Sequence, residues 1–545
     1  MPRAILAALC LVLAACSSGN DAAAPTSADA TRIRGHVFWL ADDLMEGRAA
    51  GTRGYDLAAG YVASQFASLG LQPGGDDGRW MQAVRLRRGE RIRDGAEAVL
   101  MRDGVQRALA FEDEFLPGTS FEREAWSVEA PIVFVGQAVV APELGQDDLA
   151  GLDLHGKIAV MLSGAPARFS PDERAFYASS REKLRLLDER GAVAVVYLGD
   201  PMRESRSPWA RGAANWRRPA LRLLDAEGEL VERRAGIVGT ASLSAAAAEA
   251  LFDGSEYTVA EIWEQLRTDS LHGFDLPGTL RLGGRSKHDE VSSQNVVGIV
   301  PGSDPALSAQ HVVYTAHLDH LGVGAPVGGD AIYNGALDNA LGVALLVETA
   351  RLAATGPRSS RSRVFVALTA EEHGLLGAEH FAANPGLSGP VIANINMDMP
   401  VILSELVDVI PIGIEHSSLE SVVRREAGAL GIRLTPDPFP EEVVFVRSDQ
   451  FAFVRRGIPA VYLDGGLTAA DGSARGKTEL EGFLRQHYHQ PSDDLELPIH
   501  YPSAARLADL NHRIGLAVAN DAEPPRWKEG DFFAERFADR RPEAP

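Results

Sequence analysis

The feature that most constrains this chain is a regular alternation of apolar strand-like and helix-like segments between residues 294 and 520. Short runs rich in valine, isoleucine and alanine predict strands, and longer stretches with apolar residues at helical spacing predict the helices between them. The predicted strands are 296–300, 312–316, 364–369, 391–397 and 460–463, and the predicted helices include 341–353 and 419–430. Strands that alternate with helices predict an α/β fold, here a mixed-sheet sandwich with helices on both faces.

The regions on either side of this segment differ from it. Apolar residues within 31–72 predict two helices that are separated by a break at 47–54. Between about residues 128 and 282, three strand patterns and one helix pattern occur in the order strand, strand, helix, strand, which predicts a compact inserted domain. The last residues, 522–545, are polar and rich in proline, so we expect a loosely attached tail.

The N-terminus predicts export and a lipid anchor. Arg3 precedes an apolar run, 4–15, which is shorter than the roughly 20 residues that span a bilayer, and the run therefore indicates a secretory signal. It ends in Leu-Ala-Ala before Cys16, which resembles a bacterial lipobox, and the thiol of Cys16 would carry the lipid. An ordinary signal peptide with a chance cysteine is the alternative. The other cysteine, Cys10, would be removed with the signal, so we expect no disulfide.

The overall charge limits the partners of the chain. The 545 residues carry a formal net charge of −22, which argues against nucleic acid because phosphate binding requires a basic surface. The charge does not identify a substrate, since a high net charge more often serves solubility.

Acidic and histidine side chains gather at the ends of the predicted strands and at the start of a helix. They are His317 and Asp319 after strand 312–316, Asp338 before helix 341–353, Glu371 and Glu372 after strand 364–369, Asp398 at the end of strand 391–397, and His489 in a later loop. Each has a structural explanation of its own, such as a helix N-cap for Asp338 or a solvated turn for the two glutamates. Their joint placement favours one site, because ligands of open α/β sheets bind at the carboxyl ends of the strands.

The residue types in this set suit zinc, which accepts imidazole nitrogen and carboxylate oxygen. A pair of ions about 3.5–4 Å apart needs a bridging carboxylate and terminal ligands on each side. The set contains enough carboxylates and imidazoles for such a pair, and it leaves one glutamate for proton transfer.

These motifs resemble a known family, the co-catalytic zinc exopeptidases of metallopeptidase family 28, which includes bacterial double-zinc leucyl aminopeptidases, aminopeptidase Y and glutamate carboxypeptidase II. The motifs that carry the resemblance are His317-Leu318-Asp319, Leu337-Asp338-Asn339-Ala340-Leu341-Gly342, Glu371-Glu372-His373-Gly374-Leu375-Leu376-Gly377, Asn396-Met397-Asp398-Met399 and Tyr488-His489-Gln490-Pro491. Their joint occurrence in this order is specific. The inserted region is similar to a protease-associated domain, with Asp153-Leu154-His155-Gly156-Lys157-Ile158 entering one of its strands.

The resemblance implies an aminopeptidase that holds two zinc ions and removes N-terminal residues from peptides. The implied zinc ligands are Asp338 as the bridge, His317 and Asp398 on one ion, and Glu372 and His489 on the other. Glu371 would be the general base for a water that the two ions activate. The resemblance also implies a cis peptide bond between Asp338 and Asn339.

The resemblance implies positioning roles as well. Asp319 would orient His317 through the second nitrogen of its ring, and Ser448 would do the same for His489. Relatives often have Ser-Asp-His where this chain has Ser448-Asp449-Gln450. This departure puts in doubt a role for a third histidine, but no implied metal ligand depends on it.

These expectations define an organisation for the whole chain. The predicted parts are a lipoprotein signal peptide at 1–15, a tether at 16–29, the N-terminal part of the catalytic domain at 30–125, a protease-associated insertion at 126–285, the zinc peptidase domain at 286–521 and the tail at 522–545. Such a protein would be an exported lipoprotein, anchored through Cys16 in the outer membrane or facing the periplasm, with peptides as its substrates.

Three alternatives remain open. A carboxypeptidase or dipeptidase on the same scaffold would need arginines directed at a substrate carboxylate, for which Arg447 and Arg485 are candidates, although no clear cluster is visible. A non-catalytic binding protein would be favoured by the loss of Glu371 or of a metal ligand, and none is missing. A glutaminyl cyclase would usually work with one metal, and the full two-metal set counts against it.

Overall fold

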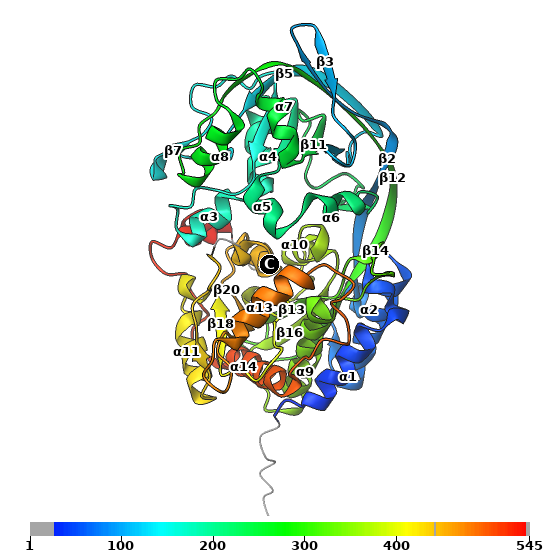
Figure 1. Ribbon diagram of the computed structural model, residues 1–545. Helices are drawn as coiled ribbons and strands as arrows, with labels where there is room; N and C mark the ends of the chain where they lie inside the picture. The colour runs from blue at the N-terminus through cyan, green and yellow to red at the C-terminus, as the bar shows by residue number, and fades with distance from the viewer. Residues whose placement is uncertain (1–26, 441–442, 541–545) are drawn as a thin grey trace, which may run out of the picture.

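The computed structural model describes residues 27–440 and 443–540, and it shows an α/β protein with two lobes (Figure 1). The predicted signal peptide, Cys16 and nearly all of the predicted tether lie outside the described residues, so these expectations stay predictions. Among the helices of the described residues, none combines the length and the apolar character that crossing a bilayer requires.

The lower lobe is built on a mixed sheet whose central strands are parallel. β13 (His311–His317) pairs in parallel with β16 (Ser362–Leu368) on one side and with β17 (Val391–Asn396) on the other, and β17 pairs in parallel with β20 (Ala460–Gly465). Every residue of β13, β16 and β17 is buried, as is typical of parallel strands covered on both faces. The predicted α/β class is therefore confirmed.

Helices cover both faces of this sheet. One face carries α1 (Ala30–Leu40), α2 (Arg53–Ser68), α9 (Gly342–Thr355), α11 (Leu419–Ala429) and α14 (Tyr501–Asn520), and the other carries α10 (Leu376–Ala383) and α12 (Gln450–Val454). Side chains alternate along a strand, so Val312 and Tyr314 of β13 pack with the first group, whereas Val313 packs with the second. The helices predicted within 31–72 and at 341–353 and 419–430 are present, with ends shifted by a few residues.

Two long strands join the lobes, and of these only residues 296–300 were predicted as a strand. β2 (Met81–Arg102) and β12 (Phe274–Val300) pair as antiparallel neighbours along one side of the molecule (Figure 1). Many of the outward positions of β2 are arginine or glutamate, so the sequence lacks the apolar run that would indicate a strand. The predicted domain boundary between residues 285 and 286 falls inside β12.

The upper lobe continues the same sheet. β5 (Ala125–Phe134), β8 (Ile158–Leu162), β9 (Ala194–Leu198) and β11 (Gly239–Leu243) are neighbours in parallel pairs, and β5 also pairs with β12. α4 (Ser180–Glu189) lies between β8 and β9 in the chain, so the predicted order of strand, strand, helix and strand is present. The identity of this lobe as a protease-associated domain stays a prediction.

The C-terminal segment is packed against the lower lobe as far as the structure describes it. α15 (Phe532–Phe537) starts at the N-cap residue Asp531, and it buries Phe533 and Phe537 beside Phe445 and Phe451. The expectation of a loosely attached tail is thus wrong for this helix. A helix of six residues is too short for a periodic pattern to stand out among polar residues and prolines.

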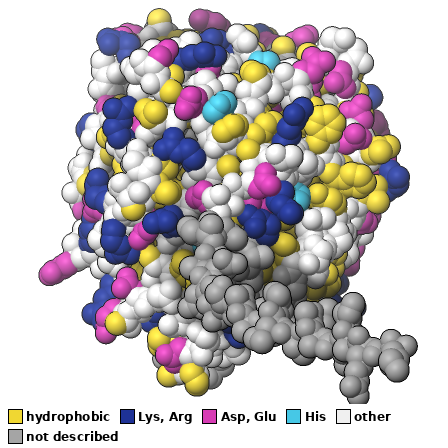
Figure 2. Space-filling model, turned by 90° about the horizontal axis from the view of Figure 1, so that it is seen from below, with side chains coloured by type: hydrophobic (Ala, Val, Ile, Leu, Met, Phe, Trp, Pro, Cys, Tyr) yellow, Lys and Arg dark blue, Asp and Glu magenta, His cyan; other side chains and the backbone are white. Residues whose placement is uncertain are grey.

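The surface of the lower lobe carries charges of both signs. Figure 2 shows lysine and arginine side chains interspersed with aspartate and glutamate on the face seen from below. A surface of mixed sign steers ligands less than a field of one sign does. The face in this view therefore presents charges of both signs without a large field of one sign.

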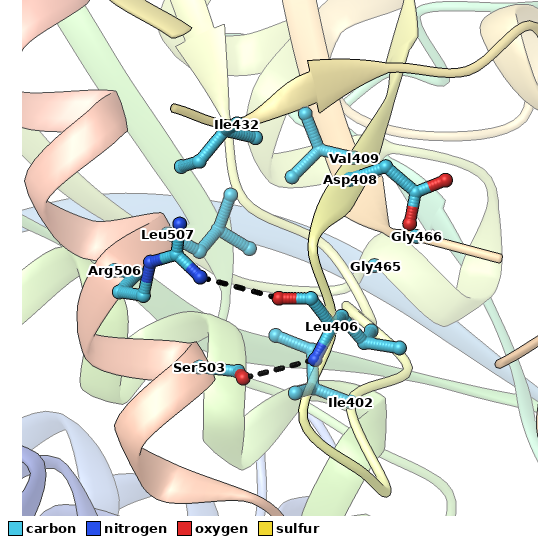
Figure 3. A pocket seen from close by; sticks show the side chains of 10 residues that line it. All are labelled: Ile402, Leu406, Asp408, Val409, Ile432, Gly465, Gly466, Ser503, Arg506 and Leu507. Atoms are coloured by element: carbon cyan, nitrogen blue, oxygen red, sulfur yellow. Dashed lines mark hydrogen bonds between the residues drawn. The ribbon is translucent and has the colours of Figure 1, made fainter. Parts of the chain in front are cut away.

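A small cavity lies between α14 and β18 (Asp408–Ile412), and it encloses about 20 Å³ (Figure 3). Its lining is mostly apolar, and two hydrogen bonds flank it. The backbone N–H of Leu406 donates to Ser503 Oγ, and Arg506 donates to the carbonyl oxygen of Leu406. This volume holds roughly one water molecule, and no predicted site residue lines the cavity, so it is not the substrate site.

The packing of α15 can be tested with a pair of phenylalanines. Phe533 is 0% exposed, and we expect Phe533→Ala to lower the free energy of unfolding by about 3–5 kcal/mol, because the change leaves a cavity in the core. Phe38 is 52% exposed on α1, so Phe38→Ala should change it by less than about 1 kcal/mol. Urea unfolding followed by circular dichroism measures both values, and similar small losses for the two variants would contradict the packing.

Candidate metal centre

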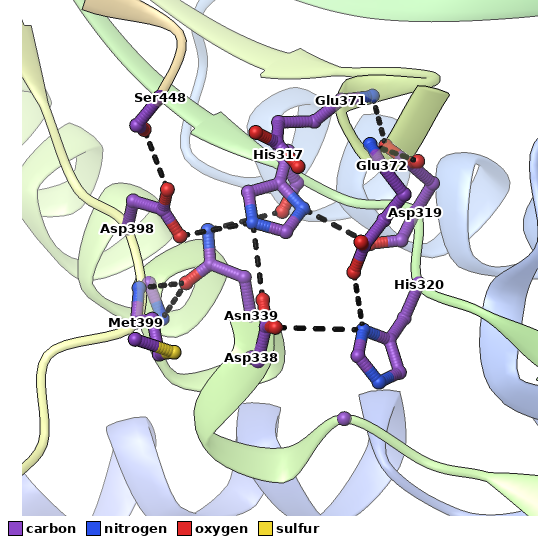
Figure 4. A network of polar contacts seen from close by, with 12 residues as sticks. His317, Asp319, His320, Asp338, Asn339, Glu371, Glu372, Asp398, Met399 and Ser448 are labelled. Carbon is purple, nitrogen blue, oxygen red and sulfur yellow. Dashed lines mark hydrogen bonds and ion pairs between the residues drawn. The ribbon is translucent and has the colours of Figure 1, made fainter. Parts of the chain in front are cut away.

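The predicted site residues converge at the carboxyl ends of the parallel strands, and Figure 4 labels all of them except His489. His317 is the last residue of β13, and Asp319 lies in the segment that follows it. Glu371 and Glu372 lie in the turn after β16, and Asp398 lies in the segment after β17. Asp338 lies in the irregular turn before α9, and His489 lies in the loop after α13 (Arg475–Gln486). Parallel strands end at the same edge of a sheet, which is why residues far apart in the sequence meet here.

The first group of side chains forms around His317. Its Nε2 atom lies 2.9 Å from Asp398 Oδ1 and 3.3 Å from Asp338 Oδ1. Its Nδ1 atom lies 3.0 Å from the carbonyl oxygen of Asp319, an acceptor that requires the hydrogen on Nδ1. The lone pair of Nε2 therefore faces the two carboxylates, as in an imidazole oriented for a metal.

The second group forms around His489. Its Nε2 atom lies 3.2 Å from Glu372 Oε2 and 3.3 Å from Asp338 Oδ2. Asp338 thus turns one carboxylate oxygen toward each group. The Asp338–Asn339 peptide bond is cis, which confirms that expectation.

His320 also belongs to the cluster, although it was not among the predicted site residues. Its Nδ1 atom lies 2.7 Å from Glu372 Oε1 and 3.9 Å from Asp338 Oδ2. The side chain is buried, and its Nε2 atom has no hydrogen-bond partner among the described residues. The sequence signal that could have indicated His320 is its position directly after Asp319, just beyond the end of a predicted strand.

Burial and neighbouring charged groups shift the pKa values of these carboxyl groups in different directions. It raises the pKa of Glu371 well above its usual range, an effect that His317 opposes and that the charge of Asp398 reinforces. Burial also raises the pKa of Asp319 to about 7. For Asp338, burial and the charge of Glu372 raise the pKa, but hydrogen bonds with His317 and His489 outweigh them and leave it below its usual value.

The inward-facing atoms fit divalent metal ions. They are imidazole nitrogens and carboxylate oxygens, the ligand types that zinc accepts, and closely packed buried carboxylates need positive charge between them. Two triads meet the spacing for a shared ion, His317 with Asp338 and Asp398, and His320 with Asp338 and Glu372. Both triads include Asp338.

Asp319 differs from its expected role. Its carboxylate does not contact His317 but accepts hydrogen bonds from the backbone N–H groups of Glu371 at 3.0 Å and Glu372 at 3.3 Å. Only its carbonyl oxygen pairs with His317. The carboxylate therefore positions the turn that carries the two glutamates.

Ser448 contacts Asp398 and not His489, its predicted partner. Ser448 Oγ donates to Asp398 Oδ2 and accepts a hydrogen bond from Asn396 Nδ2 at 2.7 Å. Gln450 stands where relatives often have histidine, and it accepts from the same Asn396 nitrogen at 2.8 Å. This segment therefore supports the group of side chains around His317.

A buried arginine connects the loops around the site. Arg48 lies in the break between α1 and α2, and its guanidinium donates to four carbonyl oxygens, those of Leu40, Leu318, Asn334 and Gly335. Asp493 completes this frame, because its carboxylate accepts from the backbone N–H groups of Leu337 and Asp338. The turn that presents Asp338 is thus held by side chains from two distant parts of the chain.

The contact between Ser448 and Asp398 predicts a measurable effect on metal binding. We expect Ser448→Ala to weaken metal affinity about 10- to 100-fold, because hydrogen bonds to a ligand hold it in place. Ser421→Ala is a matched control, since the exposed Ser421 hydroxyl donates only to the nearby carbonyl oxygen of Ser418. Competition with a chromophoric chelator measures both affinities. Equal affinities for the two variants would show that Ser448 does not support the ligand.

Comparison with known proteins agrees with this geometry. The sequence model of peptidase family M28 matches residues 295–514, which contain every residue of the cluster. An aminopeptidase from Aneurinibacillus sp. strain AM-1 shares the fold, with a TM-score of 0.54 and 19% identity over 91% of this chain and 96% of that one. A zinc aminopeptidase from Bacillus subtilis also matches, with a TM-score of 0.45 and 18% identity over 92% of this chain and 97% of that one. No curated protein sequence gives a significant match. Residues 295–514 therefore match peptidase family M28, and the chain shares the fold of the Aneurinibacillus aminopeptidase.

Proposed function

We propose that the protein is a zinc-dependent aminopeptidase with two metal ions, which hydrolyses the N-terminal residue of peptides. The match of residues 295–514 to a peptidase family supports hydrolysis of peptide bonds, and the Aneurinibacillus protein of the same fold is an aminopeptidase. The observation that carries the proposal of two ions is the placement of Asp338. Its Oδ1 atom faces His317 and its Oδ2 atom faces His489.

In this proposal the two groups of ligands hold one ion each. His317, Asp338 and Asp398 would hold the first, and Asp338, Glu372 and His489 would hold the second, with His320 beside Glu372. Bound zinc supplies Lewis acidity, which polarises a carbonyl group and lowers the pKa of water.

Glu371 is the proposed proton acceptor. It belongs to neither triad, although its neighbour Glu372 does, and Figure 4 shows its side chain beside His317. Asp319 holds the backbone N–H of Glu371 and so fixes the turn that carries it. From this place Glu371 can take a proton from the attacking water and deliver it to the leaving amine.

The charge of the site supports recognition of the substrate's free amino group. The buried groups of the cluster are carboxylates and histidines, and a free α-ammonium group complements them in charge. A substrate carboxylate would be repelled at the same place, since an unmatched buried charge is costly.

One arginine supports a second candidate, a dipeptidase or carboxypeptidase. Arg218, from the upper lobe, stacks on Tyr333 with its guanidinium carbon 4.2 Å from the ring centre. Its Nε and Nη2 atoms have no hydrogen-bond partner among the described residues. Burial lowers the pKa of Arg218, and the nearby charges of Tyr333 and Glu372 act in the opposite direction. A guanidinium so close to the cluster could receive the carboxylate of a short substrate.

The roles of the two neighbouring glutamates can be separated. Glu371→Gln should lower kcat by at least about a hundredfold, because it removes the proton acceptor, while metal content stays at the wild-type level. Glu372→Gln should lower metal content as well, because it removes a ligand. Metal analysis and steady-state kinetics on the folded variants measure both effects. Loss of metal from Glu371→Gln alone would show that the two roles are reversed.

Blocked substrates decide which end of the peptide is recognised. Acetylation of the N-terminus should lower kcat/KM by at least about a hundredfold, or roughly 2.7 kcal/mol, since it removes the ammonium charge. Amidation of the C-terminus should have a much smaller effect. The opposite pattern in a matched set of dipeptides and tripeptides would favour the candidate in which Arg218 binds the carboxylate.

A further inference from the structure

A second cluster of metal-ligating side chains lies where the two lobes and the C-terminal segment meet. His416 ends the short helix η7 (Ile414–His416) of the lower lobe, and Glu415 precedes it. Asp172 lies in the first turn of α3 (Pro171–Tyr177) in the upper lobe. Asp531 caps α15, which contacts α3, and Figure 1 shows α3 beside the red C-terminal segment.

The orientation of the His416 ring is fixed by Asp531. His416 Nδ1 lies 2.8 Å from Asp531 Oδ2. The other carboxylate oxygen of Asp531 accepts from the backbone N–H groups of Phe533 and Ala534, so this carboxylate acts as an acceptor throughout. Nδ1 therefore carries the hydrogen, and the lone pair of Nε2 points away from Asp531. A carboxylate on the far nitrogen is the usual arrangement behind a metal-binding histidine.

The Nε2 atom of His416 faces two further carboxylates. It lies 3.6 Å from Asp172 Oδ1 and 4.0 Å from Glu415 Oε1, and these distances are too long for hydrogen bonds. Zinc bonds of about 2.0–2.2 Å in tetrahedral geometry place two ligand atoms roughly 3.4 Å apart, so a small movement brings all three atoms onto one ion. The three atoms lie within 4.8 Å of one another.

Burial makes this arrangement costly without a cation. The His416 side chain is 2% exposed, and Nε2 has no hydrogen-bond partner among the described residues. The rings of Phe445 and Phe533 lie 4.6 Å and 5.0 Å from the imidazole, so apolar walls flank it. A buried polar atom without a partner is unfavourable, and so are two carboxylates that share one space. The Glu415 side chain is 61% exposed, which leaves the cluster open to an ion from solvent.

We propose that Asp172, Glu415 and His416 bind a zinc ion in addition to the metal of the peptidase centre. One imidazole and two carboxylates suit zinc, whereas calcium and magnesium prefer oxygen ligands alone. Asp172 belongs to the upper lobe and the other two ligands belong to the lower lobe, so the ion ties the lobes together. Asp531 connects the C-terminal helix to the same site.

This zinc site lies close in the chain to the support of the peptidase centre. Phe445, which packs on His416, belongs to η9 (Val444–Val446), and α3 contacts this short helix. Ser448 follows two residues later and donates to Asp398. An ion at His416 would therefore restrain the segment that holds a ligand of the peptidase centre.

The test compares zinc stoichiometry between variants of the full chain. Each protein is equilibrated with zinc and desalted, and its zinc is counted by mass spectrometry. The double variant Asp172→Asn/Glu415→Gln, which changes two partly or fully exposed side chains, should hold one zinc equivalent less than wild type. The control Asp113→Asn/Glu249→Gln removes the same charge from two exposed positions elsewhere and should keep the wild-type count. An unchanged count in the first double variant overturns the proposal and leaves a proton as the occupant of Nε2.

Two further measurements separate this site from the peptidase centre. The variant His317→Ala should bind less zinc than wild type at the peptidase centre. When Asp172→Asn/Glu415→Gln is added to this variant, it should lose one further zinc equivalent. The outcome for one site thus does not depend on the other. Added zinc should raise the Tm of wild type more than that of the double variant, because only wild type has the ion between its lobes. Equal shifts in Tm would also overturn the proposal.

Discussion

The two carboxylate oxygens of Asp338 face two separate histidine groups, and much of the lower lobe serves to hold that arrangement. The orientation of this carboxylate is tightly defined, because its two oxygens lie 3.3–3.9 Å from ring nitrogens of His317, His320 and His489. The backbone sets the orientation of Asp338. Asp493 accepts hydrogen bonds from the backbone N–H groups of Leu337 and Asp338, and Arg48 donates to the carbonyl oxygens of Asn334 and Gly335. Removing water from so many acidic groups is costly, and positive charge between them offsets that cost.

The connection between the lobes is the second constraint. β2 and β12 pass from one lobe to the other as paired strands, so the lobes share a continuous hydrogen-bonded sheet. This sheet lets the upper lobe present Arg218 near the peptidase centre and Asp172 at the cluster around His416. The inserted region thus contributes side chains near both clusters of the lower lobe.

The differences between expected and observed contacts have a common physical cause. Asp319 and Ser448 were each assigned to a histidine, but a carboxylate or hydroxyl pairs with whichever donor or acceptor the loop brings within about 3 Å. In the folded chain the turn after β16 presents its backbone N–H groups to Asp319, and Asp398 lies beside Ser448. Spacing along the sequence carries no information about such a choice.

The sequence by itself determined the α/β class, the central strands and helices, and the residues of the candidate metal centre except His320. Those predictions rest on local signals, because hydrophobic period and residue type are properties of short segments. Only the tertiary structure decided β2 and the length of β12, the packing of α15, the partners of Asp319 and Ser448, and the approach of Asp172 to His416. These features depend on contacts between segments that are distant along the chain, and their geometry exists only once the sheet and its loops have formed.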